Sequence, residues 1–172
     1  APEHGSVSEG PTTFGSEASY GCDEGYDLVG ASTRSCASDG SWDGEAPSCQ
    51  ISDCGGLEAP LNGSVSAEST TFGSVANYSC DGGYALEGSS TTRCQSDRSW
   101  SAERPSCVNI NECELGTDTC DENAACSDTA GSFSCACNAG YSGDGVDCRN
   151  VDECGDPDLN NCDEHAACSD TA

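Results

Sequence analysis

Residues 78–107 read YSCDGGYALEGSSTTRCQSDRSWSAERPSC, a stretch marked by three cysteines, a Gly-Tyr pair and a tryptophan. The same landmarks stand 58 residues earlier, and segments 1–49 and 59–107 align at that offset without a gap. Self-similarity at a fixed period indicates that one module occurs twice. Applied backwards from Cys54, the offset puts the counterpart of that cysteine before residue 1. We therefore expect the first copy, 1–49, to be truncated at its N-terminus.

A second repeat follows the first. The eleven residues CDENAACSDTA at 120–130 return as CDEHAACSDTA at 162–172, and NINEC at 109–113 returns as NVDEC at 150–154. These matches predict a second kind of module, whose last copy breaks off after its third cysteine.

Composition narrows the class of protein. Sixteen cysteines in 172 residues are typical of secreted proteins that replace an apolar core with disulfides. Thirty-one Asp and Glu stand against five Arg, a net charge of −26, which excludes nucleic acid and anionic membranes as partners and favours calcium. No apolar stretch reaches the roughly 18 to 20 residues that span a bilayer. The sequence predicts a secreted, extracellular chain with no membrane insertion in this segment.

Local patterns predict β-structure. Runs such as 76–80 and 132–137 alternate apolar and polar residues between Gly, Asp and Asn turns, and no window shows a helical apolar period. The expected fold class is small, disulfide-rich all-β modules in tandem.

The order of landmarks in 54–107 resembles the sushi, or complement control protein, family. The matching motifs are Asn62-Gly63-Ser64-Val65, Tyr78-Ser79-Cys80, Gly83-Tyr84-Ala85-Leu86, Cys94, Trp100 and Pro105-Ser106-Cys107. The resemblance implies disulfides Cys54–Cys94, Cys80–Cys107 and, in the first module, Cys22–Cys49. It leaves Cys36 for a partner outside residues 1–172.

Residues 109–148 resemble a calcium-binding EGF-like module through six cysteines that include a C-x-C at 135–137, and residues 150–172 resemble the start of another. The implied bonds are Cys113–Cys126, Cys120–Cys135, Cys137–Cys148 and Cys154–Cys168. Cys162 is left for a cysteine beyond residue 172. A zinc site is the alternative reading of these cysteines, but only His4 and His165 are present and no paired C-x-x-C occurs.

The same resemblance implies a set of oxygen ligands for Ca²⁺, which prefers six to eight of them. The entry of the module supplies the side chains of Asn109 and Glu112 and the carbonyl of Ile110. The pattern C-x-D-x(4)-F-x-C-x-C supplies Asp128 and the carbonyls of Thr129 and Ser132. In the last module the counterparts form an incomplete set: Asn150, Val151, Glu153, Asp170 and Thr171. The alternative is an acidic surface that places carboxylates everywhere without binding a cation.

Linker lengths predict the stiffness of the junctions between modules, and two sequons predict N-glycosylation. One residue, Val108, separates Cys107 from Asn109, so calcium at this junction should stiffen it, whereas the longer linker 50–53 lacks ligands and is expected to bend. The sequons at Asn62 and Asn77 predict two N-glycans on the second module only.

No catalytic constellation is present, so we predict that this portion is not an enzyme. The favoured function is a secreted, calcium-binding structural glycoprotein: a rod-like segment of an extracellular matrix or a filament such as a mastigoneme, with copies of itself as protein partners. The alternative is a ligand-binding ectodomain of an adhesion or complement-regulator-like receptor.

Overall fold

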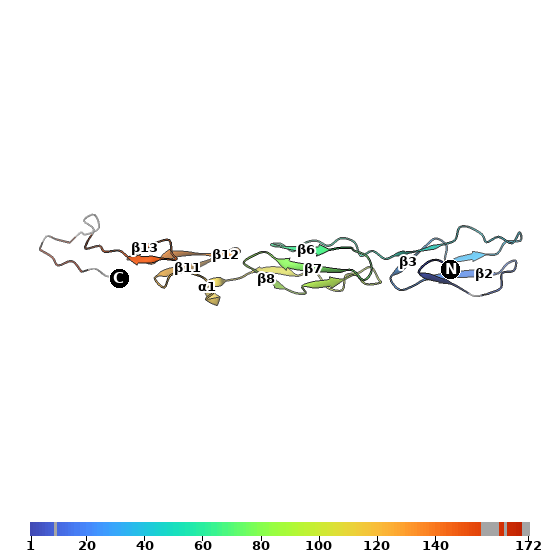
Figure 1. Ribbon diagram of the computed structural model, residues 1–172, viewed down its shortest axis with the longest axis horizontal. Helices are drawn as coiled ribbons and strands as arrows, with labels where there is room; N and C mark the ends of the chain where they lie inside the picture. Colours follow the sequence, from blue (N-terminus) through green and yellow to red (C-terminus); the bar gives the residue numbers. More distant parts are fainter. Residues whose placement is uncertain (9, 156–161, 164, 170–172) are drawn as a thin grey trace. The chain divides into compact units, whose positions relative to one another are not determined.

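The computed structural model describes residues 1–8, 10–155, 162–163 and 165–169. The chain forms two compact units. Figure 1 labels several of their strands and the helix α1. Unit 1 comprises Ala1–Cys80 and Leu86–Cys107, and unit 2 comprises Asp81–Ala85 and Val108–Ala172. The segment Asp81–Ala85 belongs by sequence to the second sushi-like module, yet it packs with the module that follows.

The two sushi-like modules repeat the same strands. The first contains β1 (Gly5–Val7), β2 (Glu17–Cys22), β3 (Tyr26–Val29), β4 (Thr33–Ser35) and β5 (Ser48–Ile51). The second contains β6 (Gly63–Ala67), β7 (Val75–Cys80), β8 (Tyr84–Glu87), β9 (Thr91–Arg93) and β10 (Ser106–Asn109). Each module has an antiparallel three-stranded sheet, β1-β2-β4 or β6-β7-β9, and a two-stranded one, β3-β5 or β10-β8.

The core of these modules is small. In β7 the residues alternate between exposed and buried, with Ala76 fully buried and Tyr78 5% exposed. Six apolar side chains are buried among the described residues, and three of them are cysteines. Because so little apolar area leaves water, crosslinks must supply much of the stability, at about 2–4 kcal/mol per bond.

Seven disulfides join the fourteen cysteines that the resemblance pairs. They are Cys22–Cys49, Cys54–Cys94, Cys80–Cys107, Cys113–Cys126, Cys120–Cys135, Cys137–Cys148 and Cys154–Cys168. Cys36 is buried outside these bonds, and its thiol donates to the carbonyl of Thr12 at 3.6 Å.

The EGF-like module is built on a hairpin of β11 (Ala124–Thr129) and β12 (Ser132–Cys137). A second, smaller hairpin pairs β13 (Tyr141–Gly143) with β14 (Cys148–Asn150). One helix, α1 (Glu112–Leu115), contacts β11. The sequence shows no helical apolar period here, because this single turn is set by its caps: Asn111 caps its N-terminus and Gly116 is left-handed at its C-terminus.

The linker between the sushi-like modules is held by hydrogen bonds. The Ser52 N–H donates to the carbonyl of Gly25, and the Ser52 carbonyl accepts from Phe72 N–H, both at 2.8 Å. The Asp53 carboxylate accepts from Gly55 N–H and from the Thr70 hydroxyl. These contacts oppose the bending that the linker's length suggests. No helix among the described residues has the length and apolar character to cross a bilayer.

Candidate metal centre

The site begins where β10 ends, at Asn109. Its amide group donates to both carboxylate oxygens of Asp128, at 2.9 and 3.2 Å, and its carbonyl oxygen accepts from Gly131 N–H at 2.6 Å. The Cys113–Cys126 disulfide joins the two stretches that carry these residues. Two ligand candidates that are 19 residues apart in sequence are therefore in direct contact.

The environment of the Glu112 carboxylate indicates whether these residues suit a bound cation. It is the first residue of α1, and its Oε2 atom is buried without a hydrogen-bond partner. A buried carboxylate oxygen without a partner costs free energy, which a bound cation offsets. The residues present thus fit a hard cation such as Ca²⁺, since they offer carboxylate and amide oxygens.

The remaining candidates of this set flank the same segment. Thr129 and Ser132 are paired across the β11–β12 hairpin, next to its turn, and the Thr129 hydroxyl donates to the Ser132 carbonyl at 2.8 Å. The Ile110 N–H donates to the carbonyl of Gly83 at 2.9 Å. Asn109 and Asp128 are exposed, so an ion could enter from solvent.

The second predicted set is described only in part. Asn150 is the last residue of β14, the Val151 N–H donates to the Gly140 carbonyl at 2.8 Å, and the Glu153 N–H donates to the Val151 carbonyl at 3.1 Å. Asp170 and Thr171 lie outside the described residues, so the set stays a prediction.

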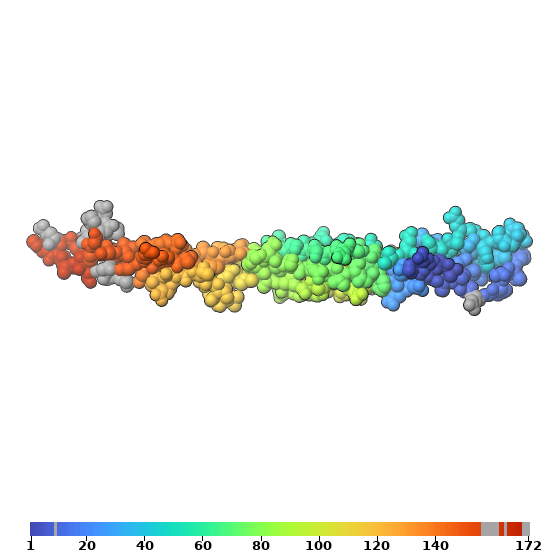
Figure 2. Space-filling model, in the orientation of Figure 1, coloured from blue at the N-terminus to red at the C-terminus, as the bar shows by residue number. Residues whose placement is uncertain are grey.

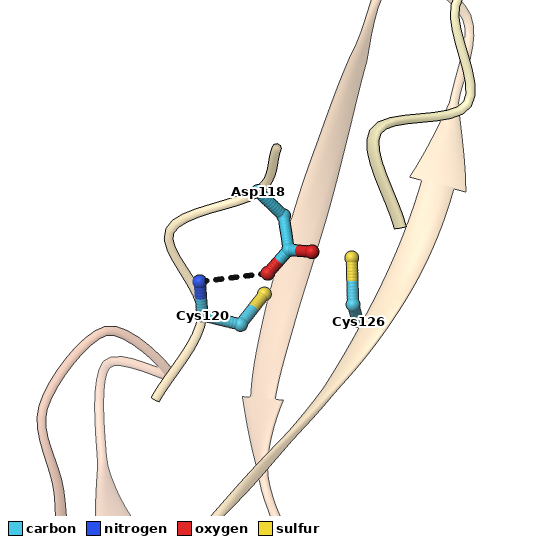
Figure 3. A group of neighbouring side chains, drawn as sticks. All are labelled: Asp118, Cys120 and Cys126. Atoms are coloured by element: carbon cyan, nitrogen blue, oxygen red, sulfur yellow. Dashed lines mark hydrogen bonds between the residues drawn. The ribbon is translucent and has the colours of Figure 1, made fainter. Parts of the chain in front are cut away.

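A different cluster, Asp118 with Cys120 and Cys126, also brings potential metal ligands together (Figure 3). Both sulfur atoms belong to disulfides, with Cys135 and Cys113, so neither is the thiolate that binds metals. The Asp118 carboxylate accepts from the Cys120 N–H at 3.0 Å. This cluster offers one carboxylate and is a weaker candidate than the Asn109 site.

The part played by Asn111 was not predicted from the sequence. Its side-chain oxygen accepts from Glu114 N–H at 3.0 Å and so caps the helix that begins with Glu112. The signal was present, because Asn followed three residues later by Glu is typical of a helix N-terminus.

The predicted glycosylation sites differ in accessibility. Asn77 is exposed on β7 and borders a hollow of about 490 Å³, which is lined also by Ser66, Ala67, Glu68, Ser69, Ser74 and Val75. Asn62 is half-buried, in a left-handed conformation. The hydroxyls of the two sequons, Ser64 and Ser79, lie 2.8 Å apart in a mutual hydrogen bond. Figure 2 shows one side of this module's surface, in green.

Comparison with protein families agrees with this architecture. The family model of the sushi repeat (SCR repeat) matches residues 1–49 and 54–107. The chain belongs to the sushi family. In this sushi-family chain, residues 113–148 additionally match the EGF domain model. The modules are extracellular and non-enzymatic, in line with the sequence prediction.

Curated relatives match more than half of the chain. The mouse "Sushi, von Willebrand factor type A, EGF and pentraxin domain-containing protein 1" is 40% identical over 144 residues, which are 84% of this sushi-family chain and 4% of the relative. Rat E-selectin is 34% identical over 122 residues, 66% of the chain and 22% of the relative. The rat C4b-binding protein beta chain is 36% identical over 111 residues, 64% of the chain and 43% of the relative. The chain thus spans a small part of the first two relatives and less than half of the third.

Proposed function

We propose that the chain is a protein-recognition segment of an extracellular sushi and EGF mosaic, in which one calcium ion fixes the entry of the EGF module. The observation that carries the calcium part is the buried, unpartnered Oε2 of Glu112, which follows Asn109 by three residues, together with the contact between Asn109 and Asp128. When bound, calcium would be held by Asn109, Glu112, Asp128 and the carbonyls of Ile110, Thr129 and Ser132. It would supply charge neutralisation and rigidity.

Protein recognition is supported by the relatives. One of them is named for binding another protein, C4b. These matches support the ligand-binding alternative better than the matrix or filament function that the sequence analysis favoured. A mastigoneme-like assembly has no specific observation in its favour.

Calcium titration with a matched pair of variants tests the metal site. We expect the wild type to bind one Ca²⁺ with a Kd on the order of 10⁻⁴–10⁻³ M, the range of extracellular modules. Glu112→Ala should weaken binding at least about tenfold, because it removes a ligand. Glu114→Ala, on the same helix but exposed, should leave the Kd within about twofold. Calorimetry that shows no binding by the wild type, or equal losses in both variants, would reject the assignment.

Chemical crosslinking of the native full-length protein, followed by mass spectrometry, tests recognition against self-assembly. The recognition function predicts crosslinks from residues 1–107 mainly to a different protein. Light scattering should then show purified protein that stays monomeric with calcium and with a chelator. Crosslinks mainly between copies, with assembly that requires calcium, would instead support the filament.

A further inference from the structure

Three modules share one arrangement at the point where the chain leaves them. The third residue after the last cysteine donates its N–H to the carbonyl of a glycine that precedes a tyrosine. The donor and acceptor pairs are Ser52 with Gly25 (2.8 Å), Ile110 with Gly83 (2.9 Å), and Val151 with Gly140 (2.8 Å). The strand that starts at each tyrosine pairs with the strand that carries the last cysteine. The chain therefore leaves each module beside its Gly-Tyr pair.

In both sushi modules this glycine is covered by a residue of the next module along the chain. Gly25 and Gly83 share a left-handed backbone, with φ of 81° and 80°. A methyl group on Gly25 would overlap the ring of Phe72, and one on Gly83 would overlap the backbone of Gly131. The equivalent glycines therefore have different neighbours. Gly25 contacts an aromatic ring within unit 1, and Gly83 contacts the turn of the β11–β12 hairpin within unit 2.

Contacts within unit 2 extend from this glycine to the candidate metal site. The ring of Tyr84 lies against Gly131, 2.7 Å from where a Cβ atom on that residue would stand. Gly131 in turn donates its N–H to the side chain of Asn109, which donates to Asp128. Holding the Gly131 turn in place therefore also orients the first predicted ligand.

We propose that the Gly83-Tyr84 pair of the second sushi module is a docking surface for the EGF hairpin turn and a positioning element of the calcium site. The proposal rests on the calcium site proposed above. Outer contacts that orient ligands typically change metal affinity by about 10–100-fold when they are lost. The Gly83-Tyr84 pair thus affects calcium binding without contributing a ligand.

The internal repeat provides a matched test. Gly83→Ala and Gly25→Ala impose the same backbone cost, because both glycines have nearly the same φ. Measured by calorimetry on the full chain, Gly83→Ala should raise the Kd for Ca²⁺ at least about tenfold, and Gly25→Ala should leave it within about twofold. Equal shifts in the two variants, or none in Gly83→Ala, would overturn the proposal.

A second readout works without calcium. In the calcium-free protein, Gly83→Ala should speed hydrogen exchange at the Gly131 amide, because its bond to Asn109 is disturbed, and Gly25→Ala should not. Failure of the wild type to bind calcium would reject the metal site, while this exchange rate would still decide whether the pair holds the hairpin. If Gly83→Ala does not fold, Tyr84→Leu replaces it, with Tyr26→Leu as control because Tyr26 stacks on His4. The same exchange and titration outcomes apply, and unchanged behaviour of Tyr84→Leu would overturn the proposal.

Discussion

At the scale of single residues, Asn111 lies outside the candidate ligand set but caps the helix that begins with the candidate ligand Glu112. It accepts the Glu114 N–H and so begins α1 at Glu112. The short helix has no buried residue to hold it, so its start depends on this cap. The cap decides the direction in which the Glu112 carboxylate is presented.

Replacement of the cap should weaken calcium binding. Asn111→Ala removes a hydrogen bond worth about 1 kcal/mol and lets α1 fray, so we expect a several-fold higher Kd for calcium. Asn111→Asp keeps an N-cap and should bind almost as the wild type does. Calorimetric titration of both variants checks this, and equal affinities in Asn111→Ala and the wild type would contradict it.

A second residue-scale prediction concerns pH and Asp53. Hydrogen bonds from the Thr70 hydroxyl and the Gly55 N–H lower the pKa of the Asp53 carboxyl. A lowered pKa in the folded state means that the carboxylate stabilises the fold above its unfolded pKa, about 3.9, and that this contribution is lost as the pH falls through the folded value. We expect Asp53→Asn to be less stable than the wild type at pH 7, with the gap closing below about pH 4.

Thermal unfolding followed by circular dichroism from pH 2 to pH 7 measures the difference in stability between the wild type and Asp53→Asn. Thr70→Val, which removes the first donor, should reduce the pH dependence while the carboxyl is retained. A gap that is the same at every pH would show that ionisation of Asp53 is not involved.

At the scale of elements, the linker between the sushi modules behaves as part of the fold. Residues 51–54 hydrogen-bond to Gly25 on one side and to the segment 70–72 on the other. Arg98 pairs with Asp27 at 2.8 Å and adds a contact across the same junction of unit 1. We therefore expect the backbone hydrogen bonds and the Phe72 packing to limit motion here more than linker length does.

The internal repeat supplies a control residue for testing the role of Phe72 at this linker. Phe72 covers Gly25 and is half-buried, whereas its counterpart Phe14 is 75% exposed. We expect Phe72→Ala to lower the free energy of unfolding by about 1–2 kcal/mol and to speed proteolysis within 50–53, since apolar area is lost from the junction. Phe14→Ala should change stability by less than about 0.5 kcal/mol. Urea unfolding and timed proteolysis compare them, and equal effects would contradict the role of Phe72.

At the scale of the whole molecule, we expect the disulfides and the proposed calcium ion to act on different properties. The disulfides hold modules whose cores are too small to fold alone, and the predicted calcium ion ties one linker to one module. The net charge of −26 adds repulsion that a divalent cation lowers.

Chelation and reduction should therefore give different results. A chelator should speed cleavage at Val108–Asn109 while the circular dichroism of the sushi modules persists, because no disulfide is broken. A reductant should unfold both units. Equal cleavage rates with and without the chelator would contradict a calcium-dependent junction.

The sequence by itself determined the modules, the β class and the set of candidate ligands. Cysteine spacing and the 58-residue repeat are local signals, and the resemblance to known families supplied the pairing that spacing leaves open. The cap at Asn111 was also readable, because a capping pattern spans only four residues.

Only the tertiary structure decided which candidates meet. Three features depend on how the disulfides and hairpins fold back on one another. They are the contact of Asn109 with Asp128, the buried oxygen of Glu112 and the contact of Gly131 with Gly83. Such contacts join residues 19 to 48 positions apart, and no local propensity encodes them. For this reason the sequence indicated candidate ligands within one module, whereas the structure shows Gly83 and Tyr84 of the preceding sushi module against Gly131, which donates to the candidate ligand Asn109.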